Sequence, residues 1–304
     1  MLPGQAFAHS VVARSPVMSR FPTPGSADFG VVVPAPAPGP GNWAGASSAA
    51  IDNDGSFVIA YRVRTARERG SHLVIARSRD GVGLSTVGQL DKLQFGAESL
   101  ERPAIVRTET GRWRLYVSCA TPGTKHWRID AVEADDPAGF LDARIRPVFP
   151  GDELTGVKDP VIRRVGSRWR AWICCHPLDL PGEEDRMYTR YATSTDGLTW
   201  PWGRIALAGR EGTWDARGAR ITAVLADGRA SYDGRATKEE NFSERTGLAT
   251  PSTPPGTLAA AGDAPVSNAR YLDVVPLPMG GYRIYYEAPL LDGSHELRTE
   301  LVMN

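Results

Sequence analysis

One pattern recurs five times along the chain: an apolar strand, a turn that contains glycine, and a second strand with an aromatic residue near its end. The spacings between these aromatic residues are 55, 56, 60 and 53, and the residues are Tyr61, Tyr116, Trp172, Tyr232 and Tyr285. Repeats of this length suit the four-stranded blades of a β-propeller, in which each blade needs its neighbours to bury its apolar face. The chain is therefore predicted to be all-β and to fold as a five-bladed β-propeller.

The first strands of the five repeats are predicted to begin near Ser47, Pro103, Pro160, Ala219 and Leu272. A candidate third strand follows each hairpin, and two of these strands run into Asp-Gly pairs, which supply the positive φ that a tight turn needs. A sandwich of two stacked sheets would contain similar hairpins. Five hairpins in the same register favour the propeller.

Residues 1–40 are interpreted as an N-terminal arm and a proline-rich linker, which leaves residues 41–304 for the propeller. The alternating prolines of residues 33–40 favour an extended, stiff conformation. The β-prone residues 29–33 have two interpretations. They form a strand that pairs with the last blade and covers its edge, or they belong to a disordered arm.

The charge of the chain excludes two classes of partner. With 35 basic and 35 acidic residues the formal net charge is zero, which gives no support to nucleic acid or an anionic membrane. The N-terminus lacks a signal-peptide pattern, because Arg14 and Arg20 interrupt its apolar stretch, and no segment approaches the roughly 20 apolar residues of a membrane span. A cytoplasmic protein with a small-molecule or oligosaccharide partner is expected, of open oligomeric state.

The three cysteines are Cys119, Cys174 and Cys175. An odd number with two adjacent residues is a poor disulfide framework, and the spacing matches no zinc site. We expect all three to be buried apolar residues in strands. No cofactor is expected, and no residue is assigned to a metal.

The residues that precede each first strand are the candidates for chemistry, since the inner strands of a propeller line its central channel and their starts converge on one pit. The carboxylates among them are Glu101, Asp159 and Asp215. The arginines are Arg102, Arg217, Arg220 and Arg270. A guanidinium group binds planar anions through two parallel hydrogen bonds. The arginines therefore either bind a ligand that carries a carboxylate or phosphate, or pair with the neighbouring acids.

The triplet Lys158-Asp159-Pro160 at a strand start, together with residues 192–200, resembles the five-bladed glycoside hydrolases. That group includes family 43 arabinanases and xylosidases, family 32 invertases and levansucrases, and the resemblance in architecture covers residues 42–304. It implies a carbohydrate-active enzyme with a base or nucleophile carboxylate in the first blade and a general-acid Glu in a later blade. Asp159 is similar to the family's middle-blade Asp, which holds the sugar or tunes a pKa.

The sequence departs from that family at two catalytic positions. Asn42 and Ser47 stand where the first-blade carboxylate would be, and Arg217 replaces the general acid. Glycoside cleavage needs two carboxyl groups that flank one bond, one protonated and one ionised. Glu101 and Asp159 open neighbouring blades and could supply this pair, with Asp215 as a third candidate. The alternative is that Glu101 and Asp159 form an inter-blade ionic network with Arg217, Arg220 or Arg270.

Further candidates lie at the ends of the second strands. Asp233 either aims a carboxylate at the pit or is a turn residue, and His176 is either catalytic or structural. Trp43, like three other tryptophans at positions 127, 202 and 214, could stack on a sugar ring or pack between sheets. The charged segment 237–245 is interpreted as a solvated loop that could act as a lid.

Three functions are therefore compared. The leading hypothesis is a glycoside-hydrolase-like, carbohydrate-active enzyme that works in the central pit through paired carboxylates. The second is a lyase or cyclase that uses the same propeller on a polar small molecule, which the missing first-blade carboxylate favours. The third is a non-catalytic sugar-binding module, which predicts that Glu101 and Asp159 are fully engaged in salt bridges.

Overall fold

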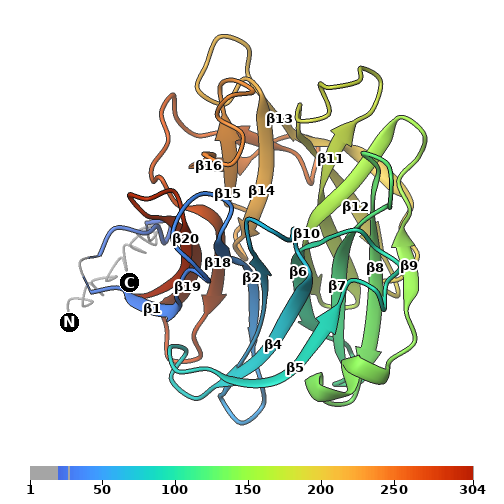
Figure 1. Ribbon diagram of the computed structural model, residues 1–304, viewed down its shortest axis with the longest axis vertical. Helices are drawn as coiled ribbons and strands as arrows, with labels where there is room; N and C mark the ends of the chain where they lie inside the picture. The colour runs from blue at the N-terminus through green and yellow to red at the C-terminus, as the bar shows by residue number, and fades with distance from the viewer. Residues whose placement is uncertain (1–19, 27, 304) are drawn as a thin grey trace, which may run out of the picture.

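The computed structural model describes residues 20–26 and 28–303, and these residues are almost entirely β-strands and connecting turns (Figure 1). The single short helix in these two segments is a 3₁₀ helix, η1 (Pro137–Asp142). None of the described helical residues forms a segment long and apolar enough to cross a membrane. The all-β prediction is confirmed.

Most strands belong to antiparallel sheets of four that follow chain order, which we call units. Unit 2 consists of β6 (Leu100–Arg107), β7 (Trp113–Ala120), β8 (Trp127–Ala134) and β9 (Arg146–Phe149). Unit 3 consists of β10 (Thr155–Val165), β11 (Arg168–Pro177), β12 (Tyr188–Ser194) and β13 (Trp202–Ala208). Unit 4 consists of β14 (Gly218–Val224), β15 (Ala230–Arg235), β16 (Arg245–Pro251) and β17 (Leu258–Ala260).

The other strands form one eight-stranded sheet with two halves. Unit 1 consists of β2 (Trp43–Ile51), β3 (Phe57–Arg64), β4 (His72–Ser78) and β5 (Ser85–Asp91). Unit 5 consists of β18 (Arg270–Pro276), β19 (Tyr282–Pro289), β20 (His295–Val302) and β1 (Gly30–Val33). The halves are joined by one parallel pair, Trp43 with His295. Division at this pair leaves five groups of four strands.

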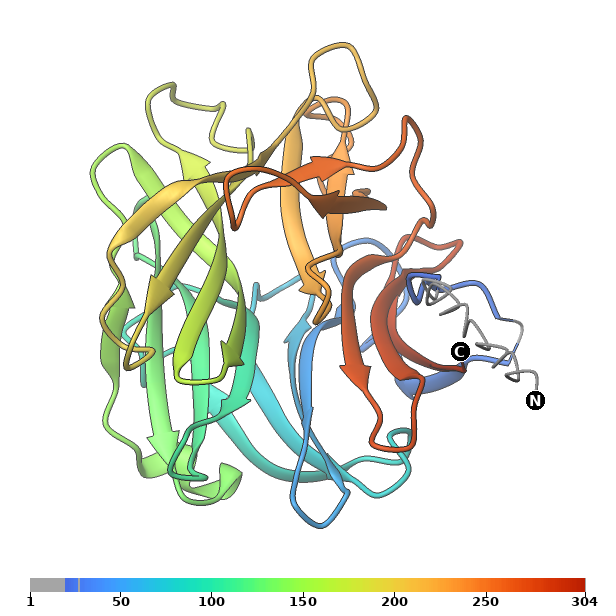
Figure 2. The ribbon, with the colours of Figure 1, turned by 180° about the vertical axis from the view of Figure 1, so that it is seen from behind.

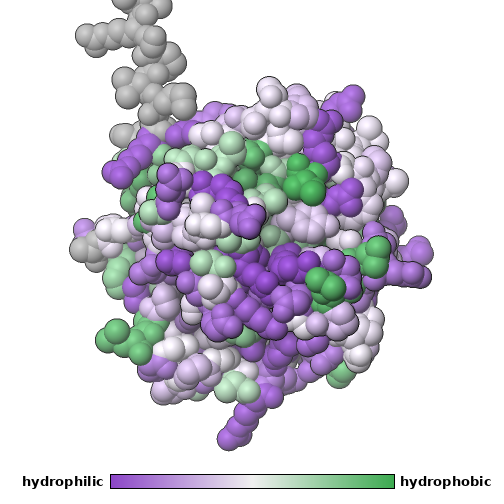
Figure 3. Space-filling view, turned by 90° about the horizontal axis from the view of Figure 1, so that it is seen from above, coloured by the Kyte–Doolittle hydropathy of each residue, from purple (hydrophilic) through white to green (hydrophobic). Residues whose placement is uncertain are grey.

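The units are arranged around a common centre, with the first strand of each unit innermost (Figures 1 and 2). The face in Figure 3 is mostly hydrophilic, and its hydrophobic side chains lie in scattered patches. The apolar core therefore lies between neighbouring units. Between units 1 and 2, for example, Val58 and Leu73 are buried with Leu100, Trp113 and Leu115. Burial of one such side chain contributes ~1.5–3 kcal/mol.

The N-terminal arm supplies the outer strand of unit 5. In β1, Gly30 pairs with Thr299 and Val31 with Arg298 of the antiparallel strand β20. The prediction that residues 29–33 pair with the last blade is confirmed, and the alternative of a disordered arm is wrong for this stretch. Phe21 is also buried, in a cluster between units 4 and 5. The part of the arm before residue 20 lies outside the described residues.

Each inner strand begins one to five residues earlier than predicted, as β10 does at Thr155 instead of Pro160. The reason is a register shift in the pairing of every inner strand with its neighbour, at Lys158/Val161 in β10 and at Arg270/Asp273 in β18. A bulge of this kind interrupts the alternation of apolar and polar residues. The strand residues before the bulge therefore lack the sequence pattern of a strand and are predicted to be loop. These early residues face the centre and carry the candidate site.

The cysteines are placed as expected. Cys119 lies in β7, and Cys174 and Cys175 lie in β11. All three are buried free thiols. The prediction of buried apolar residues in strands is confirmed.

Candidate functional site

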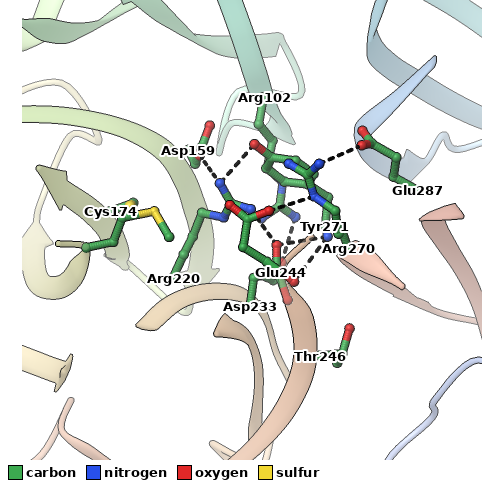
Figure 4. A network of polar contacts seen from close by, with 12 residues as sticks. Arg102, Asp159, Cys174, Arg220, Asp233, Glu244, Thr246, Arg270, Tyr271 and Glu287 are labelled. Carbon is green, nitrogen blue, oxygen red and sulfur yellow. Dashed lines mark hydrogen bonds and ion pairs between the residues drawn. The ribbon is translucent and has the colours of Figure 1, made fainter. Parts of the chain in front are cut away.

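A charge network fills the centre of the molecule at the starting ends of the inner strands (Figure 4). Its members are acidic and basic side chains from all five units, all buried: Arg62, Glu101, Asp159, Arg220, Asp233, Arg235, Glu244, Arg270 and Glu287. Inner strands contribute Glu101, Asp159, Arg220 and Arg270, as predicted. The remaining members come from second strands and from the segment before β16. The inner-strand starts therefore do converge.

One part of the network surrounds Arg220. Its guanidinium contacts Asp159 Oδ2 at 3.0 Å and Asp233 Oδ2 at 2.7 Å. The same group donates to the Tyr271 hydroxyl at 2.9 Å and lies 3.9 Å from the centre of the Tyr271 ring. The Tyr271 backbone N–H donates to Asp233 at 3.0 Å. These contacts join units 3, 4 and 5.

The other part of the network alternates in charge. Glu244 lies between Arg235, at 2.8 Å, and Arg270, at 3.0 Å. Glu287 lies between Arg62, at 2.6 Å, and Arg270, at 3.5 Å. Burial would raise the pKa of Glu244, but Arg270, Arg220 and Arg235 outweigh it and lower that pKa to about 2. The interpretation of segment 237–245 as a solvated loop is therefore wrong for Glu244.

Glu101 ends this part of the network, with its Oε2 3.0 Å from Arg62 Nε. Burial would raise its pKa, but the charges of Arg62 and Lys158 outweigh burial and leave the pKa below the ordinary value. An ionised carboxylate suits a base or an ion-pair partner and does not suit a general acid. Glu101 therefore lacks the raised pKa that glycoside protonation requires.

Asp159 is fully buried and has unusual backbone geometry. Its φ is +51°, and its backbone N–H donates to Ser118 Oγ at 2.8 Å. Among the described residues, no group donates a hydrogen bond to Asp159 Oδ1. Ala46 and Tyr271, at the bulges of two other inner strands, also have positive φ. Non-glycine residues seldom adopt this conformation, and such strain often marks functional positions.

Asp215 and Arg217 lie apart from the pair Glu101 and Asp159. The Asp215 carboxylate accepts from the Tyr232 hydroxyl at 2.6 Å and contacts Arg210 at 3.1 Å. Arg217 pairs with Asp185 at 2.7 Å and also with Glu183. The structure thus gives Asp215 and Arg217 partners of their own, so the expected assembly of three carboxylates is reduced to Glu101 and Asp159.

Arg102 crosses the centre of the molecule from β6. Its Nη2 donates to the carbonyl of Thr222 in β14 at 2.6 Å, and its Nε donates to the carbonyl of Ser47 in β2 at 3.4 Å. The side chain is buried. Arg102 therefore ties three inner strands together below the charge network.

Trp43 packs inside the molecule. Its ring stacks on His295 at 5.0 Å, its indole N–H donates to Gly293 at 3.3 Å, and the Arg64 guanidinium lies 4.4 Å from the ring centre. Since His295 and the Arg64 guanidinium lie against the Trp43 ring, the packing interpretation describes it and the sugar-stacking one does not. Asp233 lies within β15, which pairs on both sides up to Gly234, so the turn interpretation of Asp233 is wrong.

A cavity of about 550 Å³, which we call the mouth cavity, borders the charge network. Its lining comes from units 1 to 4 and includes Arg67, Glu68, Arg69, Lys92, Glu98, Ser99, Thr124, Lys125, Trp127, Lys158, His176, Glu184, Asp185, Arg235, Asn241 and Phe242. His176 Nδ1 lies 2.9 Å from the Glu184 carbonyl, and burial lowers the His176 pKa to about 3. His176 is therefore a neutral side chain at the edge of the cavity.

Lys158 is a lining residue that the sequence indicated only as part of a triplet. Its Nζ lies 4.5 Å from the centre of the Trp127 ring and 3.6 Å from Asp159 Oδ2. The sequence offered a signal for Lys158, since it adjoins the candidate Asp159. Lys158 was not predicted as a site residue, because neighbouring side chains of a strand point to opposite faces.

No cluster of three or more potential metal ligands occurs among residues 20–26 and 28–303.

Comparison with known proteins was informative only at the level of structure. The sequence matches no family model and no curated protein. A thermostable family-43 glycoside hydrolase has a TM-score of 0.65 at 14% identity, over 85% of this chain and 89% of that chain. The β-1,2-mannobiose phosphorylase from Listeria innocua has a TM-score of 0.63 at 13% identity, over 92% of each chain.

A third solved structure, the α-L-arabinofuranosidase from Lactobacillus brevis, has a TM-score of 0.62 at 13% identity, over 84% of this chain and 90% of that chain. At such identities the likeness shows the fold alone. The chain thus has the β-propeller fold of glycoside hydrolases, as the resemblance implied.

Proposed function

We propose that this protein binds a saccharide in the mouth cavity and uses a glycoside-hydrolase-like propeller as the scaffold. The observation that carries the proposal is the position of the cavity, which borders the starting ends of the inner strands and contains both an aromatic ring and polar groups. Its volume of about 550 Å³ lies in the range of small-ligand sites. The structural neighbours, which include an arabinofuranosidase and a mannobiose phosphorylase, support a carbohydrate ligand.

The lining offers the groups that a sugar needs. Trp127 supplies an apolar face, while Asn241, Glu184 and Asp185 supply donors and acceptors for hydroxyl groups. The neutral ring of His176 adds a further polar atom. A pocket with an apolar wall and a few oriented polar groups is the usual form of a small-molecule site.

Binding is better supported than hydrolysis through Glu101 and Asp159. The Glu101 carboxylate is ionised and paired with Arg62, and Asp159 is fully buried beside Arg220. Hydrolysis by two carboxyl groups requires one of them to be protonated and in contact with the glycosidic oxygen. Glu101 does not meet that condition, because the charges of Arg62 and Lys158 lower its pKa, and both carboxylates are engaged by arginines.

Hydrolysis remains the second candidate because of one observation. Asp159 Oδ1 accepts no hydrogen bond from the described residues, and the residue holds a positive φ. The salt bridge to Arg220 therefore leaves one oxygen of the Asp159 carboxylate able to accept a hydrogen bond or to contact a substrate. In this second function Asp159 acts as the catalytic carboxylate once a substrate displaces its neighbours.

The test of saccharide binding is calorimetric titration with arabino-, xylo- and manno-oligosaccharides. Trp127→Ala should weaken binding by about tenfold or more, since loss of a buried aromatic contact costs ~1.5–3 kcal/mol. Trp202→Ala is the control, because Trp202 packs on Phe149 away from the mouth cavity. Equal affinity of both variants and the unchanged protein would contradict the assigned site.

The second candidate has its own readout. We expect no release of nitrophenol from nitrophenyl arabinofuranoside, xyloside or mannoside. If release occurs and Asp159→Asn reduces it by about a hundredfold, the scale of a lost acid–base group, then the protein is a hydrolase and our preference for binding alone is wrong.

A further inference from the structure

Lys158 presents a buried ammonium group whose hydrogen-bonding capacity is unused. The residue is 8% exposed and lines the mouth cavity. An ammonium group carries three donors, yet Lys158 Nζ makes no hydrogen bond with any described residue. Its nearest acid oxygen, Asp159 Oδ2 at 3.6 Å, already accepts from Arg220 at 3.0 Å. Since Lys158 lines the cavity and the protein uses none of these three donors, they are available to an acceptor that enters the cavity.

The Trp127 ring does not supply that acceptor. It lies 4.5 Å from Lys158 Nζ and attracts the charge through its π face, but it offers no lone pair in the direction of the cavity. The ring does fix one side of the ammonium group. The remaining N–H groups are left for a molecule that enters the mouth cavity.

The lining as a whole has the same sign. Six basic residues face four acidic residues: Arg67, Arg69, Lys92, Lys125, Lys158 and Arg235 against Glu68, Glu98, Glu184 and Asp185. The difference is two positive charges, one of which is offset by Glu244, the buried partner of Arg235 at 2.8 Å. Lys92 is neutralised by Glu68 at 2.8 Å, whereas Arg67, Arg69 and Lys125 form no ion pair within residues 20–26 and 28–303. A concave surface with excess positive charge concentrates anions.

The carboxylates of the charge network, which border the cavity, are each held by an arginine. Glu101 is held by Arg62 at 3.0 Å, and Asp159 is held by Arg220. Asp233, Glu244 and Glu287 are each committed to one or more arginines of the network. The network holds five acids and four arginines, so the charge of Lys158 offsets one carboxylate, although its Nζ lies 3.6 Å from Asp159 Oδ2 and makes no hydrogen bond to it. The three N–H groups of Lys158 therefore remain available to an acceptor that enters the cavity.

From these contacts we infer that the mouth cavity selects an acidic saccharide, and that Lys158 receives its anionic group, a carboxylate or a phosphate, while Trp127 contacts the sugar. The inference rests on the proposed function, because it assigns the class of saccharide that the same cavity takes. It also assigns Lys158 as the residue that determines specificity.

The experiment compares matched acidic and neutral sugars by calorimetry at low ionic strength. The pairs are oligogalacturonate with galacto-oligosaccharide, glucuronate with glucose, and glucose 6-phosphate with glucose, and inorganic phosphate is titrated separately. We expect the acidic member to bind at least tenfold more tightly. Tight binding of oligogalacturonate or glucuronate assigns a carboxylate, whereas tight binding of glucose 6-phosphate alone assigns a phosphate.

Two variants test the role of Lys158. Lys158→Met should weaken binding of the acidic member far more than binding of the neutral member and so remove the preference, and Lys158→Arg should retain the preference. Lys92→Met is the matched control, since it removes a lysine of the same cavity that Glu68 already neutralises. If Lys158→Met does not fold by circular dichroism, the preference of the unchanged protein and of Lys158→Arg decides the question.

The outcomes separate the two proposals. Equal binding of neutral and acidic members, or an unaltered preference in folded Lys158→Met, overturns the acidic-saccharide inference and leaves the proposed function standing. Binding of inorganic phosphate as tight as that of any saccharide overturns the inference in favour of an inorganic anion site. Absence of binding by every saccharide overturns both.

Discussion

Arg220 in β14 donates to the carboxylate of Asp159 in β10 at 3.0 Å, across the boundary between units 3 and 4. Both side chains are buried, and the same guanidinium reaches Asp233 of its own unit at 2.7 Å. One cation thus holds two carboxylates that would otherwise repel each other. The loss of either carboxylate should therefore destabilise the fold.

Asp159→Asn should lower the free energy of unfolding by up to ~3 kcal/mol, because removal of one partner from a buried ion pair leaves the other charge incompletely compensated. Asp233 keeps Arg220 partly paired, which limits the loss. Urea unfolding followed by tryptophan fluorescence measures the change. Asp135→Asn is the control, because Asp135 forms an exposed pair with Arg112 and its loss should leave unfolding unaltered. Equal stability of both variants would show that the central pair does not stabilise the fold.

Protonation of Glu244 should lower the free energy of unfolding in acid. Its pKa is about 2 in the folded state, where Arg270, Arg220 and Arg235 overcome the opposing effect of burial, and its ordinary value is 4.5. A carboxyl group with a lowered folded-state pKa stabilises the fold above its unfolded pKa. This stability is lost as the pH falls from about 4.5 towards about 2.

Glu244→Gln provides the test of this pH dependence. Burial raises the pKa of Asp233 from 3.8, which gives the opposite slope from about pH 3.8 upward, so the unchanged protein alone does not isolate Glu244. The difference in unfolding free energy between the protein and Glu244→Gln should shrink as the pH falls from 5 to 2. A difference that is constant over this range would contradict the assignment.

The strand β1 should contribute to thermal stability. Val32 packs partly buried against the cluster that contains Tyr285 and Leu297, whereas Val31 is 44% exposed. Val32→Asp should therefore lower the melting temperature, and Val31→Asp should not. Deletion of residues 1–34 removes the strand and should lower the melting temperature at least as far as Val32→Asp does. An unchanged melting temperature in the deletion variant would show that β1 is dispensable.

The three thiols should be unreactive in the folded protein. Burial raises the pKa of Cys175 to about 12 and raises those of Cys119 and Cys174 as well, so the nucleophilic thiolate is absent near pH 8. Ellman's reagent should label none of them before unfolding and all three in guanidinium chloride. Fast labelling of one thiol in the folded state would reveal an opening of β7 or β11.

The repeat and the inner-strand residues of the site could be predicted from the sequence, because both depend on local sequence pattern. Alternating apolar residues and glycine turns locate each hairpin, and the position of Asp159 before a proline marks an inner strand. The bulges escaped detection, since they break the alternation at Lys158 and Arg270. Strand starts were consequently placed too late.

The partners of the candidate carboxylates were less accessible to sequence reasoning. Glu101 pairs with Arg62, which lies 39 positions earlier in another unit, and Glu244 reaches the network from a segment that reads as a polar loop. Neither spacing follows from strand periodicity. The packing of units around the centre decides these pairs, and it also decides that Trp43 lies against His295 rather than open to a ligand.

The pairing of β1 with β20 has a mechanical consequence. The strands are antiparallel, so the start of β1 at Gly30 lies beside Thr299, close to the end of β20, and these two strand ends lie at the same side of the pair (Figure 2). Force applied at the start of β1 and the end of β20 therefore breaks the hydrogen bonds between the two strands one after another, in an unzipping geometry. In a shearing geometry, all of these hydrogen bonds would carry the load at the same time. Under an optical trap, β1 should detach at low force and before any other strand, releasing a short, fixed length of chain.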